Sequence, residues 1–196
     1  MNLKKRTKEF ISFLREDSYP SLIVSIILII LIIKLIFFPL LSFITGTPLP
    51  LVVVESCSMY HETDFETWWE KNEAWYTNQG ISKEDFEKYP FKEGLNKGDI
   101  IFVWGRGNYS LGDIIIFNAL AKYPIIHRAI TAEPYSTKGD HNSDQISYSN
   151  GGNIDETNIS EDQILGKAIG KIPLIGWIKL IIFEPFRNPS ERGFCK

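Results

Sequence analysis

The stretch LIVSIILIILIIKLIFFPLLSFI, residues 22–44, is almost entirely apolar and carries a single charge, at Lys34. A membrane-spanning helix needs about 20 such residues, so this run is long enough to cross a bilayer. One lysine is tolerated in a span by snorkelling or by facing a partner helix, and snorkelling is the preferred interpretation of Lys34. The sequence therefore predicts one transmembrane helix, residues 20–41, in contact with a lipid bilayer.

A buried helix and a cleavable signal peptide both fit the apolar run less well than a spanning helix does. A buried helix of a soluble domain would need a core that surrounds it on all sides, and a chain of 196 residues is too short to supply one. A cleavable signal peptide has an apolar region of about 7 to 15 residues that ends in small residues. This run is longer and continues through Phe37 and Phe38.

Basic residues gather on one side of the predicted span. After Lys34, no lysine or arginine follows until Lys71. The basic residues before the span are Lys4, Lys5, Arg6, Lys8 and Arg15. The positive-inside rule then predicts a cytoplasmic N-terminus, residues 1–19, and an extracytoplasmic domain, residues 42–196. The membrane would be the cell membrane, or the endoplasmic reticulum membrane in a eukaryote.

The overall composition excludes some classes of partner. Lysine and arginine number 21 against 24 aspartates and glutamates, a net charge of −3, so nothing indicates binding to nucleic acid. Cys57 and Cys195 are too few for a disulfide framework and lack zinc-ligand spacing. A bridge between them is the less favoured interpretation, because Cys57 lies inside a motif described below. We expect no metal and no cofactor.

The part after the span has mostly the pattern of β-strands, with turn residues between them. Residues 98–101 and 112–117 flank the turn-rich segment 105–108 and predict a β-hairpin. In the strand predicted over residues 123–131, alternation places His127 on one face and Arg128 on the other. The remaining expected elements are a strand at 51–54, a turn at 138–144, a loop from 150 to about 160, a closing strand at 163–172 and a core or interfacial segment at 174–183.

Residues 61–94 interrupt this pattern with a polar, aromatic-rich insertion. Two helix-start signals, Thr63 with Glu66 and Ser82 with Asp85, predict two short helices. Its aromatic residues are expected to face inward, and the alternative is that they rest on the membrane interface. These residues are Phe65, Trp68, Trp69 and Trp75.

A serine becomes a useful nucleophile only when a neighbouring base accepts its proton. Of the three histidines, His61 opens the insertion, His141 lies in a predicted turn, and His127 alone sits within a strand. A lone histidine on a strand is ordinarily a core residue with one hydrogen bond. Its sequence context must therefore decide its role.

Four short motifs supply that context, and their order along the chain resembles the boxes of signal peptidase I. The motifs are Ser56-Cys57-Ser58-Met59, Gly112-Asp113-Ile114-Ile115-Ile116-Phe117, His127-Arg128 and Lys138-Gly139-Asp140-His141-Asn142. Residues 166–178 also look like the last strand and C-terminal segment of that family, so the resemblance covers about residues 20 to 183 outside the insertion. Bacterial members typically carry a lysine base where this chain has His127. The match is therefore to the archaeal and endoplasmic-reticulum branch, which looks like a Ser–His enzyme helped by an acidic residue.

The resemblance implies a fold and a set of catalytic roles. The fold is mainly β, a signal-peptidase-like β catalytic domain with a small helical insertion behind one N-terminal transmembrane helix. Ser58 would be the nucleophile and His127 the general base. Asp140 and Asp144 are both candidates for the acid that orients the imidazole, and Asp144 is preferred. The Ser56 hydroxyl and the Ser58 backbone N–H would hold the oxyanion.

The resemblance also implies the substrate, a signal peptide of a secreted preprotein, bound extended beside a strand. Further membrane subunits remain an open question. Cys57 and His61 depart from the family pattern, since a small residue and a proline are usual near those positions. Two rival hypotheses therefore stay open: a Cys57-dependent protease or transpeptidase, and an inactive membrane-tethered domain that binds peptides.

Overall fold

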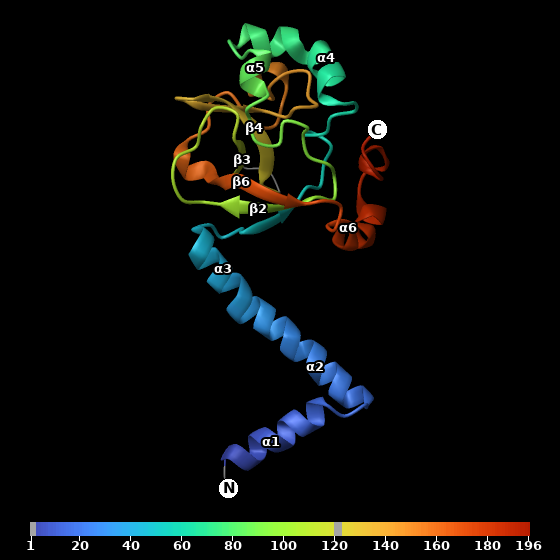
Figure 1. The fold of residues 1–196 in the computed structure, drawn as a ribbon. Helices are drawn as coiled ribbons and strands as arrows, with labels where there is room; N and C mark the ends of the chain where they lie inside the picture. The colour runs from blue at the N-terminus through green and yellow to red at the C-terminus, as the bar shows by residue number, and fades with distance from the viewer. Residues whose placement is uncertain (1–2, 120–122) are drawn as a thin grey trace. The chain divides into compact units, whose positions relative to one another are not determined.

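The computed structural model describes residues 3–119 and 123–196, so the first two residues of the predicted cytoplasmic segment lie outside the described residues. The chain divides into two compact units, Met1–Ile44 and Thr45–Lys196. Figure 1 shows the helical first unit in blue and the second unit, built around a sheet, in the remaining colours.

The first unit holds a short helix, α1 (Leu3–Leu14), and one long helix. The long helix runs from Tyr19 to Thr45 with a mean hydropathy of 3.1, and by length and composition it could cross a membrane. It therefore supports the predicted span and extends past both of its ends. Its parts are α2 (Tyr19–Ile32), the π-helical turn η1 (Ile33–Phe37) and α3 (Phe38–Thr45).

The π-helical turn has a cause in the sequence. Pro39 lacks a backbone N–H and its ring crowds the preceding turn, so the regular hydrogen-bond ladder is interrupted there. The N–H of Phe38 bonds to the carbonyl of Ile33, five residues back, which is the π-helical pattern. Lys34 lies in this turn.

The second unit is built on one antiparallel sheet of six strands, in the order β1-β2-β6-β3-β4-β5. The prediction of a mainly β domain is confirmed. The strands are β1 (Leu51–Val53), β2 (Ile100–Trp104), β3 (Ile114–Phe117), β4 (Ile125–Ala132), β5 (Tyr135–Lys138) and β6 (Ile164–Ile172).

The predicted hairpin between residues 98–101 and 112–117 is wrong. Strands β2 and β3 do not pair with each other, because β6 lies between them and pairs with both. The connection over residues 105–113 is long enough to pass across the end of one intervening strand, which a two-residue hairpin turn could not do. Strand β5 was also not expected, since its last residue, Lys138, was assigned to a turn.

Strand β3 lies inside the sheet and is buried on both faces, which explains its uninterrupted apolar sequence. Ile114 and Ile116 pack in one core cluster, and Ile115 and Phe117 pack in another. Neighbouring β4 pairs His127 with Ile115. The pairing with the buried strand β3 thus fixes the position of His127 in the sheet, opposite Ile115.

The expected helical insertion is confirmed as α4 (Phe65–Asn78) and α5 (Lys83–Phe86). Ser82 caps α5 as predicted, whereas α4 is capped by Asp64, one residue after the expected Thr63. Phe65, Trp68 and Trp69 of α4 are buried with Ile130 of β4, so they face inward. Figure 1 shows both helices beside β4.

The last α-helix among the described residues is α6 (Trp177–Phe183), whose Leu180 is buried while Ile178, Ile181 and Ile182 are exposed. Of the two alternatives for residues 174–183, core or interfacial segment, the core interpretation holds for Leu180, and the exposed isoleucines are compatible with the interfacial one. Short 3₁₀ turns complete the unit: η2 (Tyr148–Asn150), η3 (Glu161–Gln163), η4 (Glu184–Phe186) and η5 (Pro189–Glu191).

Candidate active site

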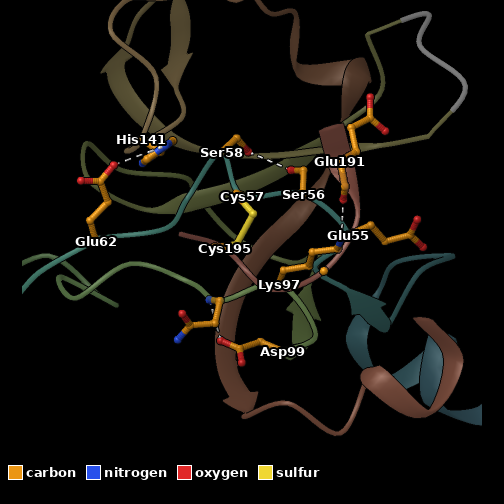
Figure 2. The surroundings of a disulfide bond; sticks show 12 residues. Glu55, Ser56, Cys57, Ser58, Glu62, Lys97, Asp99, His141, Glu191 and Cys195 are labelled. Carbon is orange, nitrogen blue, oxygen red and sulfur yellow. Dashed lines mark hydrogen bonds and ion pairs between the residues drawn. A yellow bond between two sulfur atoms is a disulfide. The ribbon is translucent and has the colours of Figure 1, made fainter. Parts of the chain in front are cut away.

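Ser56 and Ser58 lie in the turn that follows β1, and their hydroxyl oxygens are 3.1 Å apart. Figure 2 shows this contact with Cys57 between the two serines. Ser56 is exposed and Ser58 is partly exposed, so both hydroxyls can be approached from solvent. The Ser58 carbonyl accepts a hydrogen bond from the N–H of His141 at 2.9 Å. The predicted nucleophile is therefore attached to the Lys138–Asn142 motif through its backbone.

His127 is 3% exposed, and the absence of a side chain at Gly139 makes room beside its ring. A Cβ atom at Gly139 would lie 2.9 Å from His127 Nε2 and 2.7 Å from the Ser58 carbonyl oxygen. The amide nitrogen of Asn142 would lie 2.8 Å from the same point. Real Cβ atoms do not approach other atoms this closely. The space over Gly139 is thus where the predicted base and the backbone of the predicted nucleophile meet.

The other ring nitrogen of His127, Nδ1, contacts the carboxylate of Glu156. Glu156 is fully buried, and it also accepts hydrogen bonds from the hydroxyl of Thr137 at 3.0 Å and the N–H of Ile146 at 2.8 Å. A carboxylate at Nδ1 favours the tautomer that carries its proton there. Nε2, the nitrogen beside Gly139, is then left as a proton acceptor.

Asp140, one of the two predicted acids, does not contact His127. Its carboxylate pairs with Arg128, at 2.9 Å to Nε and 2.7 Å to a terminal nitrogen, and accepts a hydrogen bond from His61 Nε2 at 3.1 Å. Burial by itself raises the pKa of Asp140, but the Arg128 charge and the hydrogen bonds from His61 and Arg128 outweigh it and hold the pKa well below its usual range. The reason is alternation along β4, which points Arg128 away from His127. Asp140 pairs with Arg128 and therefore also lies on the side of β4 that is away from His127.

The guanidinium of Arg128 is fully buried and uses all five of its N–H groups. Two bonds go to Asp140, and three go to the carbonyl oxygens of Pro90, Phe91 and Gly112. The guanidinium therefore ties the insertion to the sheet. This is a structural role, and Asp140 supplies the counter-charge for it.

Asp144, the preferred candidate acid, is also placed away from His127. It is exposed and accepts hydrogen bonds from the indole N–H of Trp75 at 2.9 Å and from the N–H of Gln145 at 2.8 Å. The acid next to His127 is Glu156, and neither predicted aspartate has that position.

Lys138 raises the question of a second base, because burial lowers the pKa of its amine to about 8. Its Nζ atom donates a hydrogen bond to the Gly139 carbonyl at 3.1 Å and lies over the rings of Trp75 and Tyr76. These contacts turn the amine toward the insertion. His127 remains the group whose free nitrogen faces the space beside Ser58.

Cys57 and His61, the two departures from the family pattern, both have structural partners. Cys57 forms a disulfide with Cys195, with Cα atoms 5.6 Å apart, so the expectation against this bridge is wrong. The separation of 138 residues along the chain hid it. His61 is buried, with its ring stacked on Trp68 at 3.8 Å. These contacts give no support to His61 as an alternative to His127 for the role of base.

Glu156 was missed because little in the sequence marks it. It lies within the predicted loop from 150 to about 160, directly after another acidic residue, Asp155. The sequence does carry the two-residue spacing of Ile154 and Glu156, which puts both on one face of an extended segment. That both are buried is seen only in the structure. A carboxylate on the same buried face as an isoleucine is unusual, because a buried charge needs an ionic or hydrogen-bonding partner.

Sequence comparisons point to the same class of protein as the motifs. No protein-family model matches the chain. The signal peptidase complex catalytic subunit sec11 of Sclerotinia sclerotiorum is 30% identical over 102 residues, covering 46% of this chain and 57% of the relative. The corresponding subunit of Yarrowia lipolytica is 28% identical over 99 residues, covering 45% and 55%.

A longer alignment exists with the signal peptidase complex catalytic subunit SEC11 of Fusarium vanettenii, which is 26% identical over 157 residues, 74% of this chain and 70% of the relative. The chain spans a little over half the length of the first two relatives. The chain is thus similar to catalytic subunits of signal peptidase complexes, which confirms the predicted resemblance to the endoplasmic-reticulum branch of signal peptidase I.

Proposed function

We propose that this chain is a membrane-anchored serine endopeptidase that removes signal peptides from preproteins. The observation that carries the proposal is the convergence at Gly139, where His127 Nε2 and the backbone of Ser58 approach the same point, with the Ser56 and Ser58 hydroxyls 3.1 Å apart. The similarity to catalytic subunits of signal peptidase complexes supports the same activity. The apolar helix Tyr19–Thr45 supports a membrane anchor.

In this proposal Ser58 Oγ attacks the scissile carbonyl while His127 Nε2 accepts its proton. The Ser56 hydroxyl and the Ser58 N–H donate hydrogen bonds to the oxyanion that forms. His127 then gives the proton to the leaving amine, and a water molecule hydrolyses the acyl-enzyme with His127 again acting as base. Glu156 keeps the imidazole oriented and stabilises its charged form, the role first assigned to Asp144 or Asp140.

The substrate and topology follow from the position of the site in the chain. Strand β1 is at one edge of the sheet and leads directly into Ser56, so an extended peptide can bind beside it. From Ile44 to Ser58 the chain reaches at most about 50 Å, so cleavage would occur near the bilayer. The basic residues of the N-terminal segment support a cytoplasmic position for residues 1–19. Protease added outside sealed cells should digest residues beyond 50 and spare an N-terminal tag.

The decisive experiment compares the full chain with Ser58→Ala in detergent, using a synthetic preprotein that carries small residues before the cut. Cleavage by the wild type at that position, and loss of at least 100-fold in rate in Ser58→Ala, are expected. Equal cleavage by both proteins would overturn the proposal, and no cleavage by either would favour the inactive peptide-binding domain. The Cys57-dependent alternative is disfavoured already, because the Cys57 sulfur is bonded to Cys195.

A further inference from the structure

The C-terminal segment, residues 184–196, returns to the residues that flank Ser56. Arg187 donates a hydrogen bond to the Glu55 carbonyl at 3.2 Å, and its guanidinium also pairs with the Glu55 carboxylate. Cys195 is bonded to Cys57. The residue before Ser56 and the residue after it are therefore both attached to this segment. Figure 2 shows the second attachment, the bond between Cys57 and Cys195.

Ser58 is held by a different part of the molecule. Its carbonyl accepts from the N–H of His141, and the carbonyl of Met59 accepts from the N–H of Leu95 at 2.8 Å. Both donors belong to the body of the domain, outside the C-terminal segment. The nucleophile and the Ser56 hydroxyl are two residues apart, yet separate parts of the chain fix their positions.

The segment has a docking site of its own on the domain. Lys97 is 1% exposed, and its amine lies 2.9 Å from a Glu184 carboxylate oxygen and 2.6 Å from the Glu191 carbonyl. The ring of Phe194 lies 4.3 Å from that of Trp177. These contacts hold the segment in place at residues 184, 191 and 194. Two connections join the segment to residues 55–57: the disulfide and the ion pair between Glu55 and Arg187. The disulfide is the stronger one, because a partly exposed ion pair contributes little alone.

The segment stands beside the serines without covering them. Ser56 remains exposed, and a cavity of about 470 Å³ lies between residues 55–57 and residues 187–196. An inhibitory strap would bury the hydroxyl that it blocks. The C-terminal segment therefore fixes the backbone on both sides of Ser56 and leaves the Ser56 hydroxyl accessible.

We propose that Cys195 is a positioning residue for Ser56: through its bond to Cys57 it holds the Ser56 hydroxyl where the oxyanion forms, so the oxidised chain is the fully active form. This inference rests on the proposed function. A dithiol reductant can break this bond: its two thiols are oxidised to a disulfide, while Cys57 and Cys195 are each reduced to a thiol. The redox state of one bond would then control the rate of proteolysis.

The test measures kcat and KM of the full chain on the synthetic preprotein, before and after dithiothreitol, with thiols counted by mass after alkylation. Reduction should lower kcat about 10- to 100-fold, because a misplaced oxyanion donor costs up to that much. KM should change little, because the oxyanion exists only in the transition state. Reoxidation should restore kcat, and Cys57→Ser/Cys195→Ser should have the low kcat with or without dithiothreitol.

Ser56→Ala separates positioning from general loosening of the fold. Without the hydroxyl there is nothing to position, so reduction should change the residual rate of this variant less than about twofold. The same fold-loss in Ser56→Ala as in the wild type would overturn the inference, as would full kcat in wild-type protein with both thiols titrated. Absence of Ser58-dependent cleavage in the oxidised protein would instead remove the proposed function, and the inference with it.

Discussion

Two buried histidine–carboxylate pairs lie on opposite sides of β4, and they differ in what the rest of each ring meets. His127 contacts Glu156 through Nδ1, and its Nε2 faces the space over Gly139 beside Ser58. His61 contacts Asp140 through Nε2, and its ring face is stacked on Trp68. One pair is open toward a serine, whereas the other is closed by an indole.

The carboxylates differ in the same way. Glu156 is held by neutral donors, a hydroxyl and a backbone N–H, so its charge is available to an imidazolium. Asp140 already neutralises the buried Arg128. Removing one member of a buried ion pair lowers stability by about 3 to 5 kcal/mol. Asp140 therefore has a role in the stability of the fold. We therefore expect the base at His127, whose carboxylate partner is paired with no lysine or arginine among the described residues and whose second ring nitrogen faces the space over Gly139.

The largest effect expected from this comparison is on the two histidines. His127→Ala should lower kcat by about 10² to 10⁴, because the proton acceptor of the transition state is lost. His61→Ala should retain most of the rate and lose stability through its contacts with Trp68 and Asp140. Preprotein cleavage and thermal unfolding followed by tryptophan fluorescence measure the two quantities. Reversed effects would show that the base lies in the insertion.

The carboxylates provide the next test. Glu156→Gln should lower kcat by about 10² to 10⁴ with a small change in melting temperature, because the amide no longer favours the required tautomer or the imidazolium. Asp140→Asn should lower the free energy of unfolding by about 3 to 5 kcal/mol, because Arg128 stays buried without its counter-charge. Full activity in Glu156→Gln would remove it from the catalytic set.

The Asp140 pair also has a pH signature. Its folded-state pKa lies below the unfolded value of about 3.9, so its contribution is complete at higher pH and is lost as pH falls through the folded pKa. The difference in unfolding free energy between the wild type and Asp140→Asn should therefore be constant at neutral pH and shrink below about pH 4. Denaturant titrations at several pH values measure it. A difference that stayed constant down to pH 2 would contradict the pairing with Arg128.

The sequence was sufficient for the parts of the site that lie in local motifs. Ser56 and Ser58 follow β1 as expected, and strand alternation correctly separated His127 from Arg128. The apolar helix, the insertion and the closing strand β6 were also expected, since each has a periodic or capping signal of its own. The hairpin failed because pairing with β6 is a non-local choice that turn residues do not encode.

The acid and the disulfide could not be predicted for a related reason. Glu156 and His127 are 29 residues apart, and Cys57 and Cys195 are 138 apart. Contacts at such separations depend on how loops return to the sheet, and no local pattern records that path. Asp140 and Asp144 were chosen because the family motif puts aspartates near the base. The pairing of Asp140 with the buried Arg128 could be seen only in the structure, which shows what lies on each face of β4.

The smallest effect is expected at Asp144, the aspartate that sequence reasoning preferred. Its carboxylate is exposed and bonds to the indole of Trp75 and the N–H of Gln145, so Asp144→Asn keeps an oxygen acceptor for both. The rate should stay within about twofold of the wild type, and the unfolding free energy within about 0.5 kcal/mol, as for most surface substitutions. Glu156→Gln, the same change from carboxylate to amide, is the matched control measured on the same preprotein. A loss of rate in Asp144→Asn as large as in Glu156→Gln would mean that the loop from Gly139 to Asp144 rearranges when substrate binds, and that exposure in the free protein is a poor guide to the acid.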